Sequence, residues 1–398
     1  MQAYDSIRLA FLLGSGVSEA SGMLSTSELT KLLLSGEGVV RHTDENYYFS
    51  KPIDTYGEIP DAYVQRVVKF LNRLKIEIDQ YYQCERPTNY EDLYYVAGQI
   101  YDSKTGEYDN PVVQPFIDKI LPDIRPLLVG NKYESREKWQ LHELAGEATR
   151  YIRDVVLGLL EKEPRDMSHL DILKDSCKDE QVLIVDIFTL NHDTVLERCL
   201  SKYGIQFTDG FGEPLDNVRY WNPELFGSKP SKVRLFKLHG SVNWSRLRPR
   251  GGDWGSESIG IPLDGYSWRT KNPQGQGLRR VDGEPVILIG TFNKMLHYTS
   301  TIYVDLHYHF NHSLDNAHLL VICGYGFGDK GINTRIVEWI YSSSDKKVII
   351  VHPCPENLKR AARGAISNKW DAWISQKKLT VIPRAIEKTL WHDIRNSL

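Results

Sequence analysis

The sequence predicts an α/β protein built on a doubly wound parallel (Rossmann-like) sheet with a mostly helical insertion. Two observations lead to this fold class. Short apolar runs, typical of strands buried on both faces, alternate along the chain with segments of helical periodicity. The first apolar run, residues 9–13, leads directly into a glycine-rich turn, which is how a strand is connected to a helix in nucleotide-binding sheets.

The amino-terminal part of the chain contains one predicted strand followed mainly by helices. The glycine turn is followed by a helix, and residues 36–60 are polar and turn-rich, as in an extended loop or hairpin. Asn89 and Asp92 form a predicted capping box at the start of a further helix. Apolar residues at helical spacing predict amphipathic helices over residues 61–82, 112–128 and 136–160.

The carboxyl-terminal part supplies most of the predicted strands. Apolar runs predict strands at residues 182–188, 233–238, 286–289, 319–322 and 348–351. A helix is expected over residues 355–376 and an edge strand over residues 379–382. We interpret residues 1–398 as one domain, with residues 36–180 as the helical insertion and residues 251–285 as a long glycine-rich loop.

Four short segments place glycine or polar residues at the ends of predicted strands: residues 12–23, 189–193, 237–241 and 323–329. Glycine lets the backbone approach a ligand closely, and the start of a helix offers unpaired N–H groups and a positive dipole end that suit a pyrophosphate. Because the carboxyl ends of parallel strands meet at one edge of a sheet, we expect a nucleotide site there. The candidate site residues are Gly14, Ser15, Gly16, Ser18, Ser21, Asn191, Asp193, His239, Gly324, Gly326 and Asp329.

Several of these residues have a purely structural alternative. Asn191 suits a helix N-cap, and Asp193 suits the first turn of the helix that follows. Ser18 and Ser21 also suit helix capping. His239 taken alone is a common kind of hydrogen-bonded polar residue at a strand end. Both interpretations stay open for each residue at this point.

In combination, the four segments resemble the sirtuin superfamily. Gly-Ser-Gly-Val-Ser at 14–18, with Ser-Gly-Met at 21–23, is similar to the first NAD-binding signature of that family. Thr-Leu-Asn-His-Asp at 189–193 resembles its Thr-Gln-Asn-x-Asp segment, and Leu-His-Gly at 238–240 resembles its catalytic histidine motif. Gly-Tyr-Gly-Phe-Gly-Asp at 324–329 is similar to the sirtuin-like proteins of bacterial anti-phage defence.

Two departures separate this chain from the protein deacylases of the superfamily. Deacylase sirtuins hold a structural zinc with two Cys-x-x-Cys pairs after the histidine motif, whereas residues 240–290 contain no cysteine. The first motif continues as Leu-Ser-Thr-Ser at 24–27 rather than as Pro-Asp-Phe-Arg. We therefore expect no metal and a substrate other than an acetyl-lysine peptide. The five cysteines, which lack metal-ligand spacing, are Cys84, Cys177, Cys199, Cys323 and Cys354.

The resemblance implies an NAD hydrolase, with NAD as its substrate, that releases nicotinamide and ADP-ribose and depletes NAD during phage infection. It implies that residues 14–16 cradle the pyrophosphate, that Asn191 binds the nicotinamide ribose or orients the attacking water, and that neutral His239 acts as general base. The turn at 324–326, with Asp329, would hold the adenosine half. The alternatives are an NAD-dependent protein deacylase or ADP-ribosyltransferase, and a non-catalytic NAD-sensing scaffold.

Composition limits the expected partners and compartment. The net charge of −3 gives no reason to expect direct nucleic-acid binding. No segment is apolar for long enough to span a bilayer, and the unpatterned cysteines suggest reduced thiols, so we expect a cytoplasmic protein without membrane contact. The apolar and aromatic faces of residues 61–160 predict a homo-oligomer, and the resemblance suggests a HerA-type hexameric ATPase as a partner. His307, His309 and His312 invite a metal site, but helical geometry puts only the last two on one face.

Overall fold

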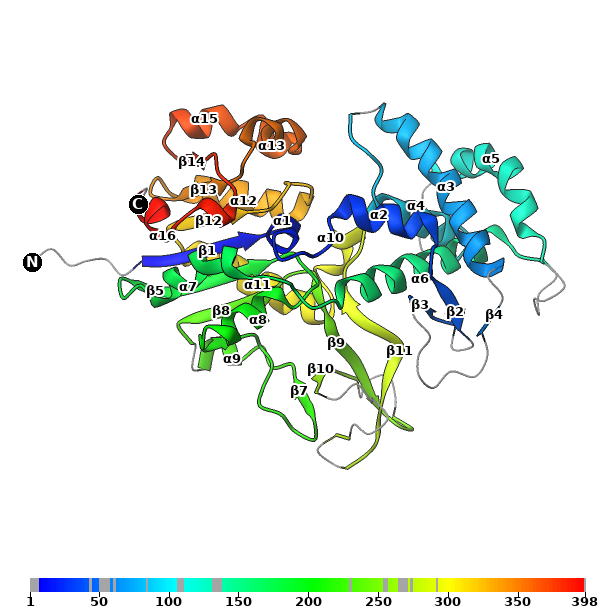
Figure 1. Ribbon diagram of the computed structural model, residues 1–398, viewed down its shortest axis with the longest axis horizontal. Coiled ribbons are helices and arrows are strands. Elements are labelled where there is room, and N and C mark those ends of the chain that lie inside the picture. The colour runs from blue at the N-terminus through cyan, green and yellow to red at the C-terminus, as the bar shows by residue number, and fades with distance from the viewer. Residues whose placement is uncertain are drawn as a thin grey trace, which may run out of the picture. The chain divides into compact units, whose positions relative to one another are not determined.

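The computed structural model describes most of the 398-residue chain (Figure 1). The described residues are 7–42, 45–49, 58–59, 62–83, 85–105, 111–130, 138–228, 231–252, 257–263, 271–272, 275–290 and 293–396. Their contacts divide the chain into two compact units. The first unit comprises Met1–Met23, Glu163–Leu288 and Met295–Leu398, and the second comprises Leu24–Lys162 and Ile289–Lys294.

A seven-stranded parallel sheet forms the centre of the first unit. Its strands are β1 (Ile7–Leu13), β5 (Val182–Thr189), β6 (Phe207–Thr208), β8 (Val233–Lys237), β12 (Leu319–Cys323), β13 (Lys347–Val351) and β14 (Leu379–Ile382). They lie in the order β14-β13-β12-β1-β5-β8-β6, and every neighbouring pair is parallel. The chain passes from β1 to β5, then to the edge strand β6 and back to β8, and it continues at β12 on the other side of β1, which is the doubly wound topology. The predicted fold class is therefore confirmed.

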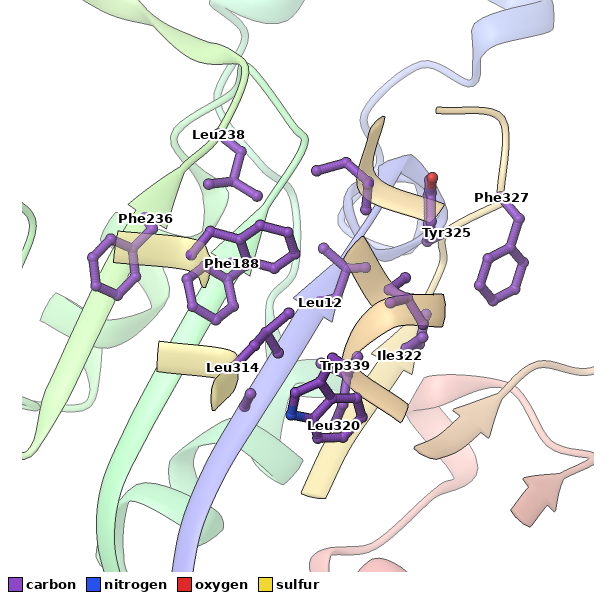
Figure 2. Packing of buried hydrophobic residues seen from close by; sticks show 14 of the residues in the cluster. Leu12, Phe188, Phe236, Leu238, Leu314, Leu320, Ile322, Tyr325, Phe327 and Trp339 are labelled. Atoms are coloured by element: carbon purple, nitrogen blue, oxygen red, sulfur yellow. The ribbon is translucent and has the colours of Figure 1, made fainter. Parts of the chain in front are cut away.

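The central strands are buried on both faces, as their continuous apolar runs predict. Every residue of β1 from Leu9 to Leu13 is at most 1% exposed. Ala10 and Leu12 belong to one core cluster with residues of α11 (Thr301–Asn316) and α12 (Lys330–Ser342). Figure 2 shows Leu12 in this cluster, beside Phe188 of β5 and Ile322 of β12. A further helix, α7 (Asp171–Lys178), packs against β5.

Short helices complete the first unit. The α-helices are α1 (Ser15–Glu19), α8 (Val195–Lys202), α9 (Leu225–Ser228), α10 (Asn293–His297), α13 (Pro355–Ala361), α14 (Gly364–Ser367), α15 (Trp370–Ser375) and α16 (Trp391–Arg395). Residues 293–294 of α10 are counted in the second unit. The 3-10 turns are η2 (Ser168–Leu170) and η5 (Ile386–Lys388). The single helix expected over residues 355–376 is instead α13, α14 and α15. The chain becomes extended at Ala362 and Arg363, just before Gly364, and this interrupts the helical hydrogen bonds.

A four-stranded antiparallel sheet occupies part of the region that we expected to be a loop. Its order is β11-β9-β10-β7, with β7 (Val218–Tyr220), β9 (Gly240–Pro249), β10 (Ser258–Pro262) and β11 (Leu278–Ile287). The prediction of a loop over residues 251–285 is therefore wrong where the structure describes that range, because β10 and most of β11 lie within it. The run at 286–289 was expected as a strand of the parallel sheet, but Ile287 ends β11 and pairs with Gly240 of β9.

The second unit is mainly helical. Its helices are α2 (Thr26–Ser35), α3 (Ala62–Tyr82), α4 (Tyr90–Thr105), α5 (Val113–Ile124), the 3-10 turn η1 (Arg125–Leu128) and α6 (Leu141–Leu160), with a small sheet of β2 (Val40–His42), β3 (Tyr47–Tyr48) and β4 (Glu58–Ile59). Asn89 caps α4 as predicted, since its Oδ1 accepts from the N–H groups of Glu91 at 3.0 Å and Asp92 at 3.1 Å.

The bounds of this unit differ from those predicted for the insertion, residues 36–180. Residues 24–35 belong to the second unit, whereas residues 163–180 belong to the first, because α7 packs on the parallel sheet. Across the part of the chain that the structure describes, we find no helix with the length and apolar character needed to cross a membrane.

Candidate functional site

The predicted site residues follow four strands that lie side by side in the parallel sheet, β8, β5, β1 and β12. Gly14 comes directly after β1, Asn191 after β5, His239 after β8 and Gly324 after β12. Because these strands are parallel, their carboxyl ends meet at the same edge of the sheet. The strand order reverses between β1 and β12, and open α/β sheets bind ligands at such a switch point.

Two glycine turns pack backbone against backbone at the switch point. The Gly16 N–H donates to the Gly324 carbonyl at 3.1 Å, and a Cβ on Gly14 would lie 2.5 Å from the same oxygen. Gly324 has a φ of +63°, which favours glycine, and its own Cβ would lie 2.5 Å from the backbone nitrogen of Val17. Gly14 and Gly324 are therefore required for the close approach of the turns. The Gly16 N–H already has a protein acceptor, and a pyrophosphate cradle at residues 14–16 stays a prediction.

Asn191 ties the end of β5 to the first glycine turn. Its Nδ2 donates to the Gly14 carbonyl at 3.0 Å and to Ser18 Oγ at 2.9 Å, and the residue is only 8% exposed. Asn191 is not the N-cap of α8, because this helix begins at Val195 and Thr194 occupies the cap position. Asn191 thus fixes Ser18 and the turn relative to β5, while its contact with a substrate stays a prediction.

The other predicted ligand residues have differing environments. Ser21 is fully buried, and its Oγ lies 3.4 Å from Nε2 of His169. Asp193 is buried, and its Oδ1 accepts from the Val195 N–H at 3.0 Å, which supports its structural alternative at the start of α8. Ser15, the first residue of α1, is exposed. A role in binding NAD stays a prediction for each of these three residues.

A hydrogen-bonded cluster surrounds His239, which is 3% exposed. Its Nε2 lies 3.1 Å from Tyr298 Oη and 3.2 Å from Asp329 Oδ2. Tyr298 Oη in turn donates to Asp329 Oδ2 at 2.6 Å. The other carboxylate oxygen, Oδ1, accepts from the Ile332 N–H at 3.0 Å, so that Asp329 is the N-cap of α12. The structure therefore joins an imidazole, a phenol and a carboxylate in one network.

These contacts change the role that we assign to Asp329. The sequence placed it with Gly324 and Gly326 at the adenosine half of NAD, but both of its carboxylate oxygens contact protein groups and one of them lies against His239. A carboxylate at this distance orients a histidine ring and fixes its tautomer. Gly326 differs from Gly324, since nothing lies within 4 Å of a Cβ placed there.

Tyr298 is a residue of the candidate site that the sequence analysis missed, and His307 was considered there only for a metal site. Their rings stack with centroids 3.7 Å apart and planes 26° apart. Burial, together with the nearby His239, lowers the pKa of His307 to about 3, so this imidazole is neutral at physiological pH. Tyr298 lies between β11 and α11, outside every motif and periodic segment, so neither spacing nor composition gave a signal for it.

The three histidines of α11 contact different groups. His307 stacks on Tyr298, His309 packs against the ring of Phe226 at 4.8 Å, and His312 stacks on Tyr308. Among the described residues, no group of three or more histidine, cysteine, aspartate or glutamate side chains could hold a metal ion.

The cysteines that the structure describes are free thiols. Burial raises the pKa of Cys177 to about 11 and the pKa values of Cys199 and Cys323 to about 12, which makes these thiols poor nucleophiles. Cys354 is exposed, and Cys84 lies outside the described residues.

Comparison with known proteins relates this arrangement to one family. The family model described as SIR2-like domain matches residues 185–382, a span that contains Asn191, His239 and Asp329 but not the first glycine turn. The match supports a sirtuin-like family. A crystal structure of a Sir2 homolog–NAD complex is similar at a TM-score of 0.35 and 11% sequence identity, covering 99% of this chain and 90% of that chain. No curated protein matches the chain.

Proposed function

We propose that the chain is an NAD hydrolase that cleaves NAD to nicotinamide and ADP-ribose and acts in bacterial anti-phage defence by depleting NAD. The observation that carries this proposal is the placement of Asn191 and His239 at the carboxyl ends of the adjacent strands β5 and β8, beside the switch point of the sheet. The SIR2-like match over the same segments supports an NAD-utilising class of enzyme.

The reaction needs side chains that activate one water molecule and bind the nicotinamide ribose. The bond between nicotinamide and ribose C1′ breaks with its electron pair leaving on nicotinamide, a water oxygen attacks C1′, and the proton of that water passes to a base. His239 is the candidate base, since a neutral imidazole accepts protons near pH 7. The amide of Asn191 can exchange its bonds to Gly14 and Ser18 for bonds to the ribose or the water.

The competing function is an NAD-dependent protein deacylase or ADP-ribosyltransferase. The absence of cysteine from residues 240–290 argues against the zinc-containing deacylases. Because uncontrolled NAD hydrolysis would harm the host, we also propose that activity is controlled in the cytoplasm by self-assembly or by a HerA-type hexameric ATPase.

The decisive experiment identifies the products of NAD cleavage by mass spectrometry and measures their rate of formation. Purified protein should release nicotinamide and ADP-ribose, and His239→Gln should reduce the rate by about 10²- to 10⁴-fold, the usual loss on removing a general base. His312→Gln, a change at an exposed histidine, is the matched control and should retain activity. Circular dichroism checks that each variant is folded.

Two further arms separate the alternatives. An acetyl-lysine peptide added with NAD should remain acetylated, and its NAD-dependent deacetylation would instead establish the deacylase. Cellular NAD is also measured after phage infection, so that an activating partner is present. The proposal fails if NAD stays constant in infected cells and the purified protein releases no nicotinamide.

A further inference from the structure

The contacts around His239 locate its proton. An ionised carboxylate only accepts hydrogen bonds, and a phenol has one hydrogen to donate. Tyr298 Oη lies 2.6 Å from Asp329 Oδ2, so its hydrogen belongs to that contact. The 3.1 Å contact between His239 Nε2 and Tyr298 Oη then needs a hydrogen from the histidine, as does the 3.2 Å contact between Nε2 and Asp329. These contacts therefore place a proton of His239 on Nε2.

Both partners of His239 are themselves held in place. Asp329 is fixed by the start of α12, through the bond from the Ile332 N–H to Oδ1 and the bond from its own N–H to Tyr325 Oη at 3.1 Å. The Tyr298 ring lies against His307 on one side, and a Cβ on Gly331 would lie only 2.7 Å from its Cε2 atom. Gly331 thus leaves the space that the Tyr298 ring fills.

We propose that Tyr298 is a positioning residue for NAD cleavage: with Asp329 it holds the proton of His239 on Nε2 and so fixes the tautomer and the orientation of the candidate base. This inference rests on the proposed function and adds a residue that lies outside every recognised motif of the chain. Tyr298 acts through His239.

The first test reads the tautomer of His239 directly and needs no turnover. Two-bond ¹H–¹⁵N spectra of histidine-labelled protein distinguish a protonated Nε2 from a protonated Nδ1, and His239→Gln identifies the signals. The wild type should show the Nε2–H form. Asp329→Asn should shift the population to Nδ1–H, because the new amide can donate to Nε2, and asparagine caps a helix as well as aspartate does. A wild-type Nδ1–H form, or a tautomer that Asp329→Asn leaves unchanged, overturns the inference.

The second test measures nicotinamide release. Tyr298→Phe keeps the ring that packs on His307 but removes the hydroxyl, and we expect kcat to fall about tenfold or more while KM stays within about twofold. Asp329→Asn should cost about 10⁴ in kcat, the loss expected when a catalytic histidine takes the wrong tautomer. Tyr308→Phe, an exposed tyrosine of α11, is the control and should match the wild type.

A third variant separates positioning from stability. Gly331→Ala adds a better helix-forming residue within α12 but displaces Tyr298, so kcat should fall without a lower melting temperature. An increase of kcat in Tyr298→Phe would mean that the hydroxyl obstructs the site, and a change in KM alone would mean that it binds substrate; either result contradicts a positioning role. If wild-type protein releases no nicotinamide, the proposed function fails while the tautomer measurement still tests the proton assignment.

Discussion

Asn191 joins the end of β5 to the first glycine turn through two buried hydrogen bonds, so its removal has a structural cost. Asn191→Ala leaves the Gly14 carbonyl and Ser18 Oγ without this donor, and losing a buried donor costs about 1–3 kcal/mol. Urea unfolding should show this loss together with the loss of NAD cleavage. Asn316→Ala, at an exposed asparagine, is the control. An unchanged free energy of unfolding in Asn191→Ala would show that these two hydrogen bonds contribute nothing to stability.

His307 makes stability depend on pH. Burial is the main cause that lowers its pKa from the unperturbed 6.5 to about 3. Between these values the unfolded chain binds a proton that the folded chain excludes, so folding stability decreases as pH falls below 6.5. His307→Phe removes this group and keeps a ring for Tyr298 to stack on.

Urea unfolding at pH 7.5 and pH 5 measures the effect of His307. At about 1.4 kcal/mol per pH unit, the free energy of unfolding of the wild type should fall by up to about 2 kcal/mol more than that of His307→Phe between pH 7.5 and pH 5. His312→Phe controls for the introduction of a phenyl ring on the same helix. Equal losses in wild type and His307→Phe would contradict the buried neutral state of His307.

At the scale of elements, the two glycines of the second turn have different functions. A Cβ at Gly324 meets the Val17 backbone and has a left-handed φ, whereas a Cβ at Gly326 meets nothing within 4 Å. Gly324→Ala should therefore destabilise the protein by about 2 kcal/mol or more, and Gly326→Ala by less than about 1 kcal/mol. Melting curves of the two variants check this difference. Similar melting temperatures would argue against the close packing of the turns.

The sequence predicted those strands whose apolar runs reflect burial on both faces. The runs ending before Gly14, Asn191, His239 and Gly324 all became parallel strands of the central sheet. The antiparallel strands β10 and β11 were missed because they lie in a stretch, residues 251–285, that is rich in glycine and polar residues as a whole. The run at 286–289 was misassigned, since a four-residue apolar run has the same pattern in either kind of sheet.

At the scale of the whole molecule, parallel topology explains why the edge of the candidate site was predictable. Strands that are parallel must deliver their following residues to one edge, so the apolar runs that precede Asn191 and His239 are enough to place both residues there. The contact of His239 with Tyr298 depends on how the connection between β11 and α11 packs, about which local sequence carries no information. The motif at residues 324–329 identified Asp329, but no motif identified Tyr298, which donates a hydrogen bond to it.

Exposed apolar side chains of the second unit bear on the oligomeric state of the protein. In the second unit, Ile76, Tyr81, Val112 and Val129 are between 52% and 79% exposed. Single exposed apolar residues are common on protein surfaces, but several on the helices of one unit fit the homo-oligomer that the sequence predicts. We expect light scattering at micromolar concentration to give a multiple of the mass of one chain.

Charged substitutions locate the surface that holds the copies together. Ile76→Glu combined with Tyr81→Glu should reduce the measured mass, because both side chains lie exposed on α3 and burying a carboxylate in an interface opposes association. Leu183→Glu, at an apolar residue of the first unit that is 49% exposed, is the control and should leave the mass unchanged. If assembly controls the enzyme, the double variant should also release nicotinamide more slowly at the same chain concentration. A wild-type monomer, or an α3 variant that assembles normally, would place control of the proposed NAD hydrolase activity in a partner protein instead.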